Sequence, residues 1–355
     1  MQAVHNDLNI TKIDKSKLES IDMNNIPFGR AFSDHMFIAR FTDGKWETPE
    51  IVPYGAMAFE PSISALNYGQ AIFEGMKAHL GPNGEPLLFR PEENLRRLNE
   101  SGARLCMEPI PQDLFMNGLK ALIDLDREWI PSPEQGSLYI RPLYFAVDEY
   151  IGVKASENYV LTIFTCPVGP YYAEPVNLLA TTEFVRAAKG GTGAAKAAGN
   201  YAAALLPDRL AKQQGYHNVL WLDAQEHTYI EECGTMNVFF QIDDTIVVPS
   251  LTGTILAGIT RHSVITLLKE AGYKVEERAV SIFEIQAAYR EGRLKDAFGS
   301  GTAATITHIA KIGFQGSDIV LPPVSEREIS NWVKGRLSDI KTLKVADEHG
   351  WVVPV

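Results

Sequence analysis

Cysteine is scarce in this 355-residue sequence, which contains only Cys106, Cys166 and Cys233, none of them in a Cys-x-x-Cys pair. Three scattered cysteines exclude a disulfide framework and are typical of a reducing compartment. No apolar run approaches the roughly 18 residues that a membrane helix needs, and the N-terminus lacks the basic-then-apolar order of a signal peptide. We therefore expect a cytoplasmic protein with no membrane partner.

Positive charge is also in short supply. The sequence has 33 Lys and Arg against 44 Asp and Glu, a formal net charge of −11 and a pI near 5.3. Binding to a nucleic acid normally needs a basic face, so this balance argues against nucleic acid as the main partner. It does not exclude a local site for one anionic group.

The sequence has no internal repeat, and 45% of its residues are hydrophobic, enough to bury a sizeable core. At roughly 150 residues per domain, the length predicts two domains. Pro167, Gly169, Pro170 and Pro175 interrupt regular structure within one short stretch. We therefore predict an N-terminal domain at 1–169, a linker at 170–175 and a C-terminal domain at 176–355.

Strands and helices are mixed without strict alternation, which favours an α+β fold over a doubly wound sheet. Asp43-Gly44 and Asn83-Gly84 are typical of β-hairpin turns, and Ser281 with Glu284 is typical of a capping box. Apolar patterning predicts helices at 92–103, 112–128, 261–271, 281–291 and 326–337, and strands at 36–41, 137–145, 159–166, 176–181, 219–222, 236–242 and 245–248.

Lys196 lies in the most unusual segment, because no side chain bulkier than Thr occurs from 190 to 195. Small neighbours leave room for a planar group to approach its amine; a solvated loop lysine is the other interpretation. Two nucleotide motifs fail here. A P-loop needs GxxxxGK[ST], but Ala195 precedes the lysine and Ala197 follows it. A dinucleotide fingerprint needs a third glycine where Lys196 stands.

Other candidates are ordinary one at a time. The segment from Gly253 to Thr260 leads into a predicted helix, whose N-terminus would bind a phosphate, although a simple Thr N-cap is commoner. Residues 298–303, Phe-Gly-Ser-Gly-Thr-Ala, form a small-residue turn or a bulge. Strand alternation points one of Glu231 and Glu232 inward, unless both are exposed at an edge. Arg141 interrupts an apolar strand.

Over most of its length the sequence resembles the branched-chain amino acid aminotransferases, which are fold-type IV pyridoxal-phosphate enzymes. The matching segments are Phe73-Glu-Gly-Met-Lys-Ala78, Asn94-Leu-Arg-Arg97, Ser137-Leu-Tyr-Ile-Arg-Pro142, Pro167-Val-Gly-Pro-Tyr171, Gly190-Gly-Thr-Gly193 with Lys196, Gly199-Asn-Tyr201, Glu232-Cys-Gly-Thr-Met-Asn237, Leu256-Ala-Gly-Ile-Thr-Arg261 and Phe298-Gly-Ser-Gly-Thr-Ala303.

The resemblance implies a two-domain α+β homodimer with a small N-terminal α/β domain, a larger C-terminal pseudo-barrel domain and pyridoxal 5'-phosphate between them. Lys196 would be the catalytic residue, carrying the cofactor as a Schiff base and shuttling a proton. The implied cofactor-binding residues are Tyr201 at the phenolic oxygen, Glu232 at the ring nitrogen, and Arg97, Ile259, Thr260 and Thr302 at the phosphate. No metal site is implied.

The implied substrate pocket has walls of apolar and aromatic residues, which suits branched aliphatic side chains. Tyr68 and Val153 would reach it across the dimer interface, and Tyr68 and Arg141 are our candidates for a polar contact to glutamate. The implied substrate-binding residues are Tyr68, Phe73, Tyr139, Arg141, Val153, Tyr171, Thr235 and Ala303.

The sequence therefore predicts reversible transamination of L-leucine, L-isoleucine or L-valine with 2-oxoglutarate, giving branched-chain 2-oxo acids and L-glutamate. Within the same fold, a D-amino acid aminotransferase or an aminodeoxychorismate lyase is the alternative, although these relatives lack the Gly-Thr-Met-Asn run. From another class, a non-catalytic ligand-binding module would be marked by loss of Lys196 or Glu232, and both are present. A nucleotide-binding enzyme is disfavoured by the two failed motifs.

Overall fold

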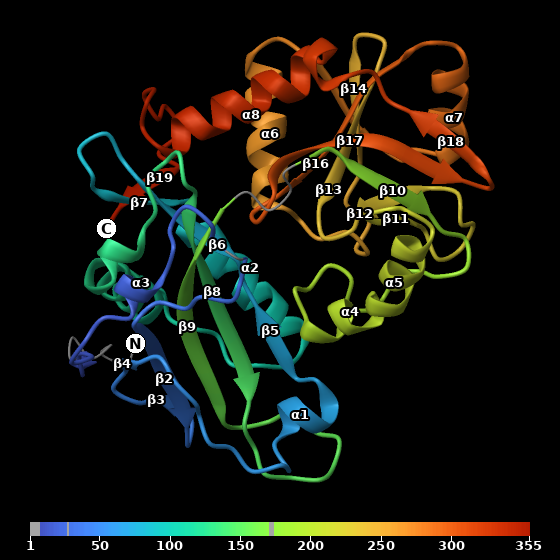
Figure 1. Cartoon of the computed structure of the whole chain (residues 1–355). Coiled ribbons are helices and arrows are strands. Elements are labelled where there is room, and N and C mark those ends of the chain that lie inside the picture. The colour runs from blue at the N-terminus through green and yellow to red at the C-terminus, as the bar shows by residue number, and fades with distance from the viewer. Residues whose placement is uncertain (1–7, 27, 170–173) are drawn as a thin grey trace. The chain divides into compact units, whose positions relative to one another are not determined.

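The computed structural model describes residues 8–26, 28–169 and 174–355, which cluster into two compact units (Figure 1). Of the described residues, unit 1 comprises 8–26, 28–169, 195–199 and 339–355, and unit 2 comprises 174–194 and 200–338. The predicted domain boundaries stay a prediction, but two segments from the predicted C-terminal range, 195–199 and 339–355, pack with unit 1.

Unit 1 is built on a mainly antiparallel sheet whose strands follow the order β1-β4-β2-β9-β8-β6-β7-β19, with β3 paired to β2 and β5 to β8. Its strands are β1 (Asn9–Ile10), β2 (His35–Thr42), β3 (Lys45–Trp46), β4 (Glu50–Pro53), β5 (Ala71–Phe73), β6 (Met76–Leu80), β7 (Pro86–Phe89), β8 (Ser137–Ala146), β9 (Tyr159–Val168) and β19 (Val352–Pro354). Its helices are α1 (Ser64–Tyr68), α2 (Pro91–Arg104) and α3 (Gln112–Leu125), with 3-10 turns at Leu18–Ser20 and Arg127–Trp129.

Unit 2 contains a second sheet, in the order β12-β11-β10-β17-β16-β13-β14-β15, with β18 paired to β17. Its strands are β10 (Val176–Ala180), β11 (Asn218–Leu222), β12 (Ile230–Cys233), β13 (Asn237–Ile242), β14 (Thr245–Pro249), β15 (Lys274–Arg278), β16 (Leu294–Gly301), β17 (Thr305–Phe314) and β18 (Ser317–Val320). The helices are α5 (Leu205–Gln213), α6 (Ile259–Glu270) and α7 (Ile282–Arg290), with a 3-10 turn at Val324–Glu326; α4 (Ala198–Ala203) and α8 (Glu328–Lys341) each include residues of both units.

Most predicted elements are confirmed to within a few residues, as is the α+β mixture of strands and helices. Asp43 and Gly44 both have positive φ, 50° and 76°, as a type I′ turn requires. The second predicted hairpin turn is wrong in detail, because the loop is longer and closes with a hydrogen bond from Gly81 N–H to the Glu85 carbonyl. Ser281 does cap α7, but Glu284 pairs with Arg278 rather than completing a capping box.

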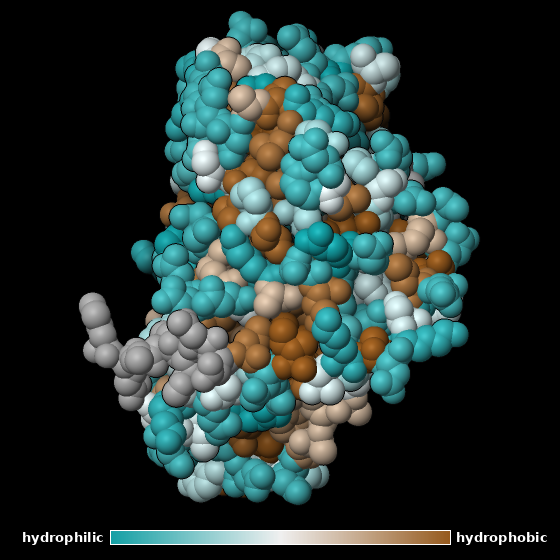
Figure 2. All heavy atoms as spheres, turned by 90° about the vertical axis from the view of Figure 1, so that its left-hand side faces the viewer, coloured by the Kyte–Doolittle hydropathy of each residue, from teal (hydrophilic) through white to brown (hydrophobic). Residues whose placement is uncertain are grey.

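Each sheet has its own core. In unit 1 the apolar face of α3, including Leu119, Leu122 and Ile123, is fully buried in the same cluster as Phe37 of β2. In unit 2, Phe240 of β13 and Ile285 of α7 are fully buried in a second cluster. The face in Figure 2 is mainly hydrophilic, interrupted by patches of apolar residues. Among the described residues, no helix is long and apolar enough to span a membrane.

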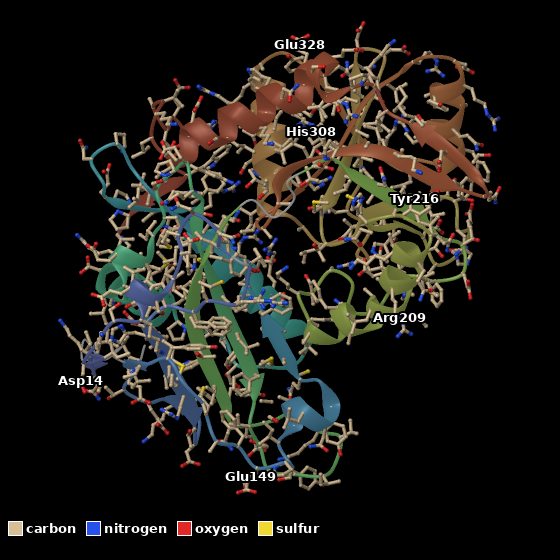
Figure 3. All side chains as sticks on the ribbon, viewed as in Figure 1. Asp14, Glu149, Arg209, Tyr216, His308 and Glu328 are labelled. Carbon is tan, nitrogen blue, oxygen red and sulfur yellow. The ribbon has the colours of Figure 1, made fainter. Side chains whose placement is uncertain are left out.

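Two glycines permit close packing that a larger residue would block. A Cβ on Gly118 of α3 would lie 2.3 Å from the Phe37 ring, and one on Gly313 of β17 would lie 2.1 Å from the Tyr216 hydroxyl. Tyr216, labelled in Figure 3, donates a 2.8 Å hydrogen bond to Asp318. The helix and the strand approach their neighbours closely because these positions lack a side chain.

We predict that Gly118→Ala destabilises the protein by about 1–3 kcal/mol through overpacking against the immobile Phe37 ring. Gly335→Ala in α8 is the matched control: a Cβ there has no neighbour within 4 Å, so helix propensity should stabilise it by up to about 1 kcal/mol. Urea unfolding followed by circular dichroism measures both. Equal stabilisation by the two substitutions would contradict the packing argument.

Candidate functional site

Lys196 is held in unit 1 by backbone hydrogen bonds to two different elements. Its carbonyl accepts a 3.1 Å hydrogen bond from the Phe73 N–H at the end of β5, and its own N–H donates 2.9 Å to the Ser101 hydroxyl on α2. Ala197 next to it forms an isolated antiparallel bridge with Ile72. The alternative of a solvated lysine on a flexible loop is therefore wrong as far as the backbone is concerned, because both the N–H and the carbonyl of Lys196 are hydrogen-bonded.

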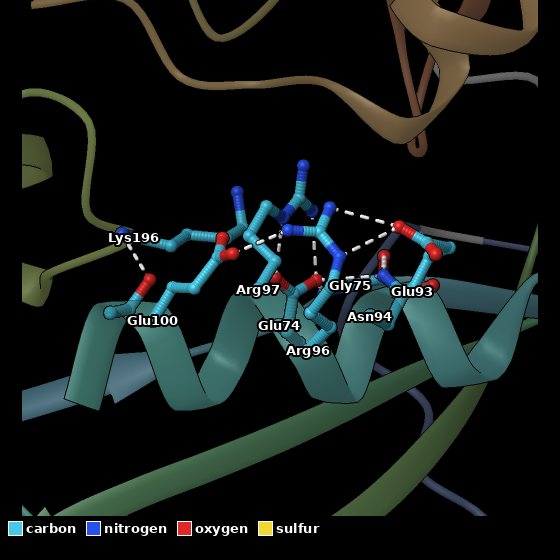
Figure 4. Close-up of polar contacts among 9 residues, drawn as sticks. Glu74, Gly75, Glu93, Asn94, Arg96, Arg97, Glu100 and Lys196 are labelled. Carbon is cyan, nitrogen blue, oxygen red and sulfur yellow. Dashed lines mark hydrogen bonds and ion pairs between the residues drawn. The ribbon is translucent and has the colours of Figure 1, made fainter. Parts of the chain in front are cut away.

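A buried ion pair lies beside this segment. Glu74 has no solvent exposure and accepts from Arg97 Nε at 2.7 Å and Nη2 at 2.9 Å. It also accepts from Asn94 Nδ2 at 2.8 Å, and Asn94 and Arg97 both come from α2 (Figure 4). The carboxylate therefore anchors α2 to the chain between β5 and β6.

Burial by itself would raise the pKa of Glu74, but the positive charge and hydrogen bonds of Arg97, the charge of Lys196 and the Asn94 hydrogen bond outweigh it, and the pKa lies below its ordinary value. The carboxylate is thus ionised at neutral pH. Sequence reasoning missed Glu74; its one signal was a charged residue between two apolar strand segments, in Phe73-Glu-Gly-Met.

Three of the predicted substrate-binding residues meet in unit 1. The Arg141 guanidinium lies 4.5 Å from the Phe73 ring centroid and 5.4 Å from that of Tyr139, and it donates to the Tyr139 hydroxyl at 2.9 Å. Lys196 Nζ lies 4.9 Å from the same Phe73 ring. A Cβ on Gly75 would lie 2.3 Å from the Tyr139 hydroxyl, so only glycine permits this approach.

The other predicted residues of this unit lie elsewhere. Tyr68, at the end of α1, is 42% exposed, and Val153 is 89% exposed. Tyr171 lies outside the described residues.

In unit 2 a small pocket brings together Tyr201, Glu232 and Thr235, with Arg186, Asn200, Trp221 and Leu256 among the other lining residues. Glu232 is 3% exposed; it accepts from the Leu256 backbone N–H and lies 3.2 Å from Arg186 Nε. Arg186 also donates to the carbonyls of Gly193 at 3.1 Å and Thr254 at 2.7 Å. No spacing in the sequence pointed to Arg186.

Both carboxylates of the Glu231-Glu232 pair are buried, at 5% and 3% exposure. The alternative that both glutamates are exposed at a strand edge is therefore wrong. Because adjacent side chains of a strand point to opposite faces, the two carboxylates lie on different sides of β12, and only Glu232 lines the pocket with Tyr201.

A tight turn connects this pocket to the start of α6. Asn237 Nδ2 donates to the Leu256 carbonyl at 2.9 Å, and a Cβ on Gly258 would lie 2.0 Å from Asn237 Oδ1. The simple interpretation of Thr260 as the N-cap is wrong, since the cap is Gly258, which has no side chain to satisfy the first N–H groups. Ile259 and Thr260 occupy the first turn of α6, where backbone N–H groups have no partner within the helix.

Thr302 and Ala303 form the turn between β16 and β17. Ser300 pairs with Asn237 across β16 and β13, and a Cβ on Gly301 would lie 3.6 Å from the Thr235 carbonyl. The turn therefore lies beside the strand end that carries Thr235 and Asn237. The small-residue segment is a strand followed by a turn, not a bulge.

Comparison with known proteins gives concordant results. The family model for class IV amino-transferases matches residues 71–312. The chain is 44% identical over 348 residues to branched-chain-amino-acid aminotransferase 2 of Bacillus subtilis (strain 168), covering 97% of this chain and 96% of that protein. The T.th. branched-chain amino acid aminotransferase, solved with pyridoxamine 5'-phosphate, aligns with a TM-score of 0.73 at 26% identity, over 89% of this chain and 97% of that chain. A second structure of it, with N-(5'-phosphopyridoxyl)-L-glutamate, also has a TM-score of 0.73, at 25% identity and the same coverage.

We predict that Glu74→Gln costs about 3–5 kcal/mol of unfolding free energy, because it leaves the buried Arg97 charge without its partner. The double variant Glu74→Gln/Arg97→Met should cost clearly less than the sum of the single changes. Urea unfolding of the four proteins in the cycle measures the coupling.

Glu93→Gln is the matched control on the same helix. Glu93 pairs with Arg96 at 2.9 Å, and the Arg96 side chain is half-exposed. The loss of unfolding free energy should therefore stay below about 1 kcal/mol. A cost for Glu74→Gln as small as that of Glu93→Gln would show that the buried pair does not stabilise unit 1.

Proposed function

Because the chain belongs to the class IV aminotransferases, we propose that it transfers amino groups between branched-chain L-amino acids and 2-oxoglutarate, using pyridoxal 5'-phosphate. The family resemblance predicted from the sequence is confirmed by the match over residues 71–312. The branched-chain substrates follow the name of the B. subtilis relative. The cofactor follows the family and the pyridoxamine 5'-phosphate bound to the T.th. relative.

The observation that carries the proposal is the pocket of unit 2, where Tyr201 and Glu232 line the same space. Bound pyridoxal phosphate supplies an aldehyde and a protonated ring that withdraws electrons from the substrate Cα. Its ring nitrogen needs a carboxylate that stays ionised, and Glu232 has a cation, Arg186, at 3.2 Å. Tyr201 offers a hydroxyl for the phenolic oxygen. These groups fit the cofactor.

The phosphate group also finds suitable donors. The first turn of α6, with Ile259 and Thr260, presents amides without a side-chain cap from Gly258. Thr302 adds a hydroxyl from the β16–β17 turn. The family resemblance also assigns the phosphate to Arg97 of unit 1, whose guanidinium is oriented by Glu74 through Nε and Nη2. A single phosphate can thus be bound by a protein with a net charge of −11.

Lys196 does the covalent and proton-transfer work in this proposal. Its amine would hold the cofactor covalently and would carry a proton at the substrate Cα. The hydrogen bonds from Phe73 and to Ser101 fix its backbone, and the Phe73 ring provides an apolar neighbour for its side chain.

Substrate selection requires a pocket that accepts both an aliphatic side chain and the carboxylate of glutamate. Phe73 and Tyr139 supply apolar surface, with Tyr139 7% exposed. Arg141 beside them has a buried Nε with no hydrogen-bond partner among the described residues, and a carboxylate would satisfy it. We assign the side-chain carboxylate of glutamate and 2-oxoglutarate to Arg141, and the substrate α-carboxylate to the Thr235 and Ala303 region.

A homodimer would use the exposed apolar surface of α1 and of residues 149–153. Ile63 forms a bridge with Glu149, so α1 and residues 149–153 are adjacent. Together they expose large apolar side chains, the most exposed being Leu66 at 71%, Ile151 at 70% and Val153 at 89%. Several exposed large apolar side chains in adjacent segments are typical of a protein interface, which supports the proposal that Tyr68 and Val153 reach the partner's site.

We predict that initial rates with a panel of L- and D-amino acids against 2-oxoglutarate will be highest for L-leucine, L-isoleucine and L-valine. Lys196→Ala should lower these rates at least about 10³-fold, since it removes the proton-transfer group, while cofactor absorbance shows residual non-covalent binding. Lys212→Ala, an exposed lysine of α5 paired with Asp208, should change nothing. Turnover by Lys196→Ala, or a preference for D-amino acids, would refute the proposal.

For Arg141→Gln we predict a KM for 2-oxoglutarate raised about 10- to 100-fold, because a charge-assisted hydrogen bond to its distal carboxylate is lost. The KM for L-leucine should change less than threefold. Arg209→Gln, an exposed arginine of α5 (Figure 3), is the control. Equal effects of Arg141→Gln on both substrates would indicate that Arg141 supports the pocket without contacting glutamate.

A further inference from the structure

Unit 2 has a second pocket, of about 550 Å³, that shares no lining residue with the pocket of Tyr201 and Glu232. It is formed by residues 188–189, the loop 223–225, the start of β12, the segment 249–255 and Ala279. The proposed transamination uses none of these residues. The pocket is large enough for a small organic molecule.

Glu231 is the polar group that this pocket leaves incomplete. The residue is 5% exposed, and one carboxylate oxygen accepts a hydrogen bond from the Thr254 hydroxyl. The other oxygen, Oε2, is buried and has no hydrogen-bond partner in the part of the chain that the structure describes. A buried carboxylate oxygen without a donor is costly, so a ligand that donates to it would be bound strongly.

The surrounding charges determine which ligand fits. Asp223 accepts four backbone hydrogen bonds, from Gln225, Glu226, Thr228 and Tyr229. Its carboxylate oxygens therefore already have donors within the loop. Lys189 lines the pocket but is exposed. Among the lining residues there are therefore two carboxylates and one solvated ammonium group, and this balance disfavours an anion.

The rest of the lining is largely apolar, with Ile230, Pro249 and Ile255 among its residues. No group of three or more potential metal ligands occurs among the described residues, so a metal ion would find too few ligands here. Burial raises the pKa of Glu231, a shift that Asp223 reinforces and that Thr254 and Arg186 oppose. A cation at Oε2 would stabilise the ionised form.

We propose that this pocket is a binding site for a small organic cation: its ammonium group donates to Glu231 Oε2, and its apolar body packs on Ile230, Pro249 and Ile255. Glu231 and Glu232 are consecutive on β12 (Figure 1), so the two faces of one short strand serve two ligands of different chemistry. The site is distinct from the proposed cofactor pocket and does not depend on that assignment.

The test is a calorimetric titration of the cofactor-loaded protein with N,N-dimethylbenzylammonium. This tertiary ammonium has one N–H and an apolar ring, and it cannot condense with the cofactor aldehyde. We expect saturable binding at one site. Glu231→Gln should weaken the binding about 10- to 100-fold, since the charge-assisted hydrogen bond is lost. Ala279 lines the pocket and is exposed, so the larger side chain of Ala279→Phe should fill the pocket and abolish binding.

Glu291→Gln removes a half-exposed carboxylate of the same unit, paired with Arg293, and should leave the affinity unchanged. Because Glu231→Gln neutralises a half-satisfied buried charge, its melting temperature should equal or exceed that of the unaltered protein, which shows that it folds. The proposal is overturned if the unaltered protein shows no saturable binding, or if Glu231→Gln or Ala279→Phe binds the probe within twofold of it.

Discussion

A carboxylate buried without any exposure must be compensated by positive charge and hydrogen bonds, and in unit 1 this requirement fixes the position of α2. Glu74 takes both Arg97 and Asn94 from that helix. Ser101, further along the same helix, then accepts the N–H of Lys196. The proposed catalytic lysine is therefore positioned, through one helix, by an ion pair that is almost fully buried.

Unit 2 satisfies a second buried carboxylate in a different way. Glu232 lies beside Arg186 and accepts the Leu256 amide, while Asn237 donates to the Leu256 carbonyl. Both the N–H and the carbonyl of Leu256 are thus bound by side chains of the sheet. The turn that contains Leu256 leads directly into α6. The amides that begin this helix are oriented before any ligand arrives, so a phosphate would bind without the cost of ordering them.

Part of this arrangement could be predicted from the sequence. The long apolar strands β8 and β9 and the amphipathic α3 follow from hydrophobic periodicity, which depends only on near neighbours in the chain. Helix α4 was missed because its Ala- and Gly-containing sequence carries little apolar periodicity, and α5 because it is short and contains Pro207. The roles of Glu74 and Arg186 could not be predicted, since each is defined by a partner in another element. The family resemblance located Lys196, Tyr201 and Glu232, which composition alone could not have selected.

The pairing of β19 with β7 has a consequence for how the chain folds during synthesis. β7 consists of the four buried residues Pro86–Phe89, and its neighbour on that side, Val352–Pro354, is translated after the whole of unit 2. Until then the growing chain carries an apolar strand edge with unpaired backbone groups, the kind of surface that invites association with other chains. The contact joins residues that are far apart in the sequence and so adds to the loop-closure cost of folding. The first sheet to be synthesised is therefore completed only after residues 352–354, which follow the whole of unit 2 in the sequence, have been added.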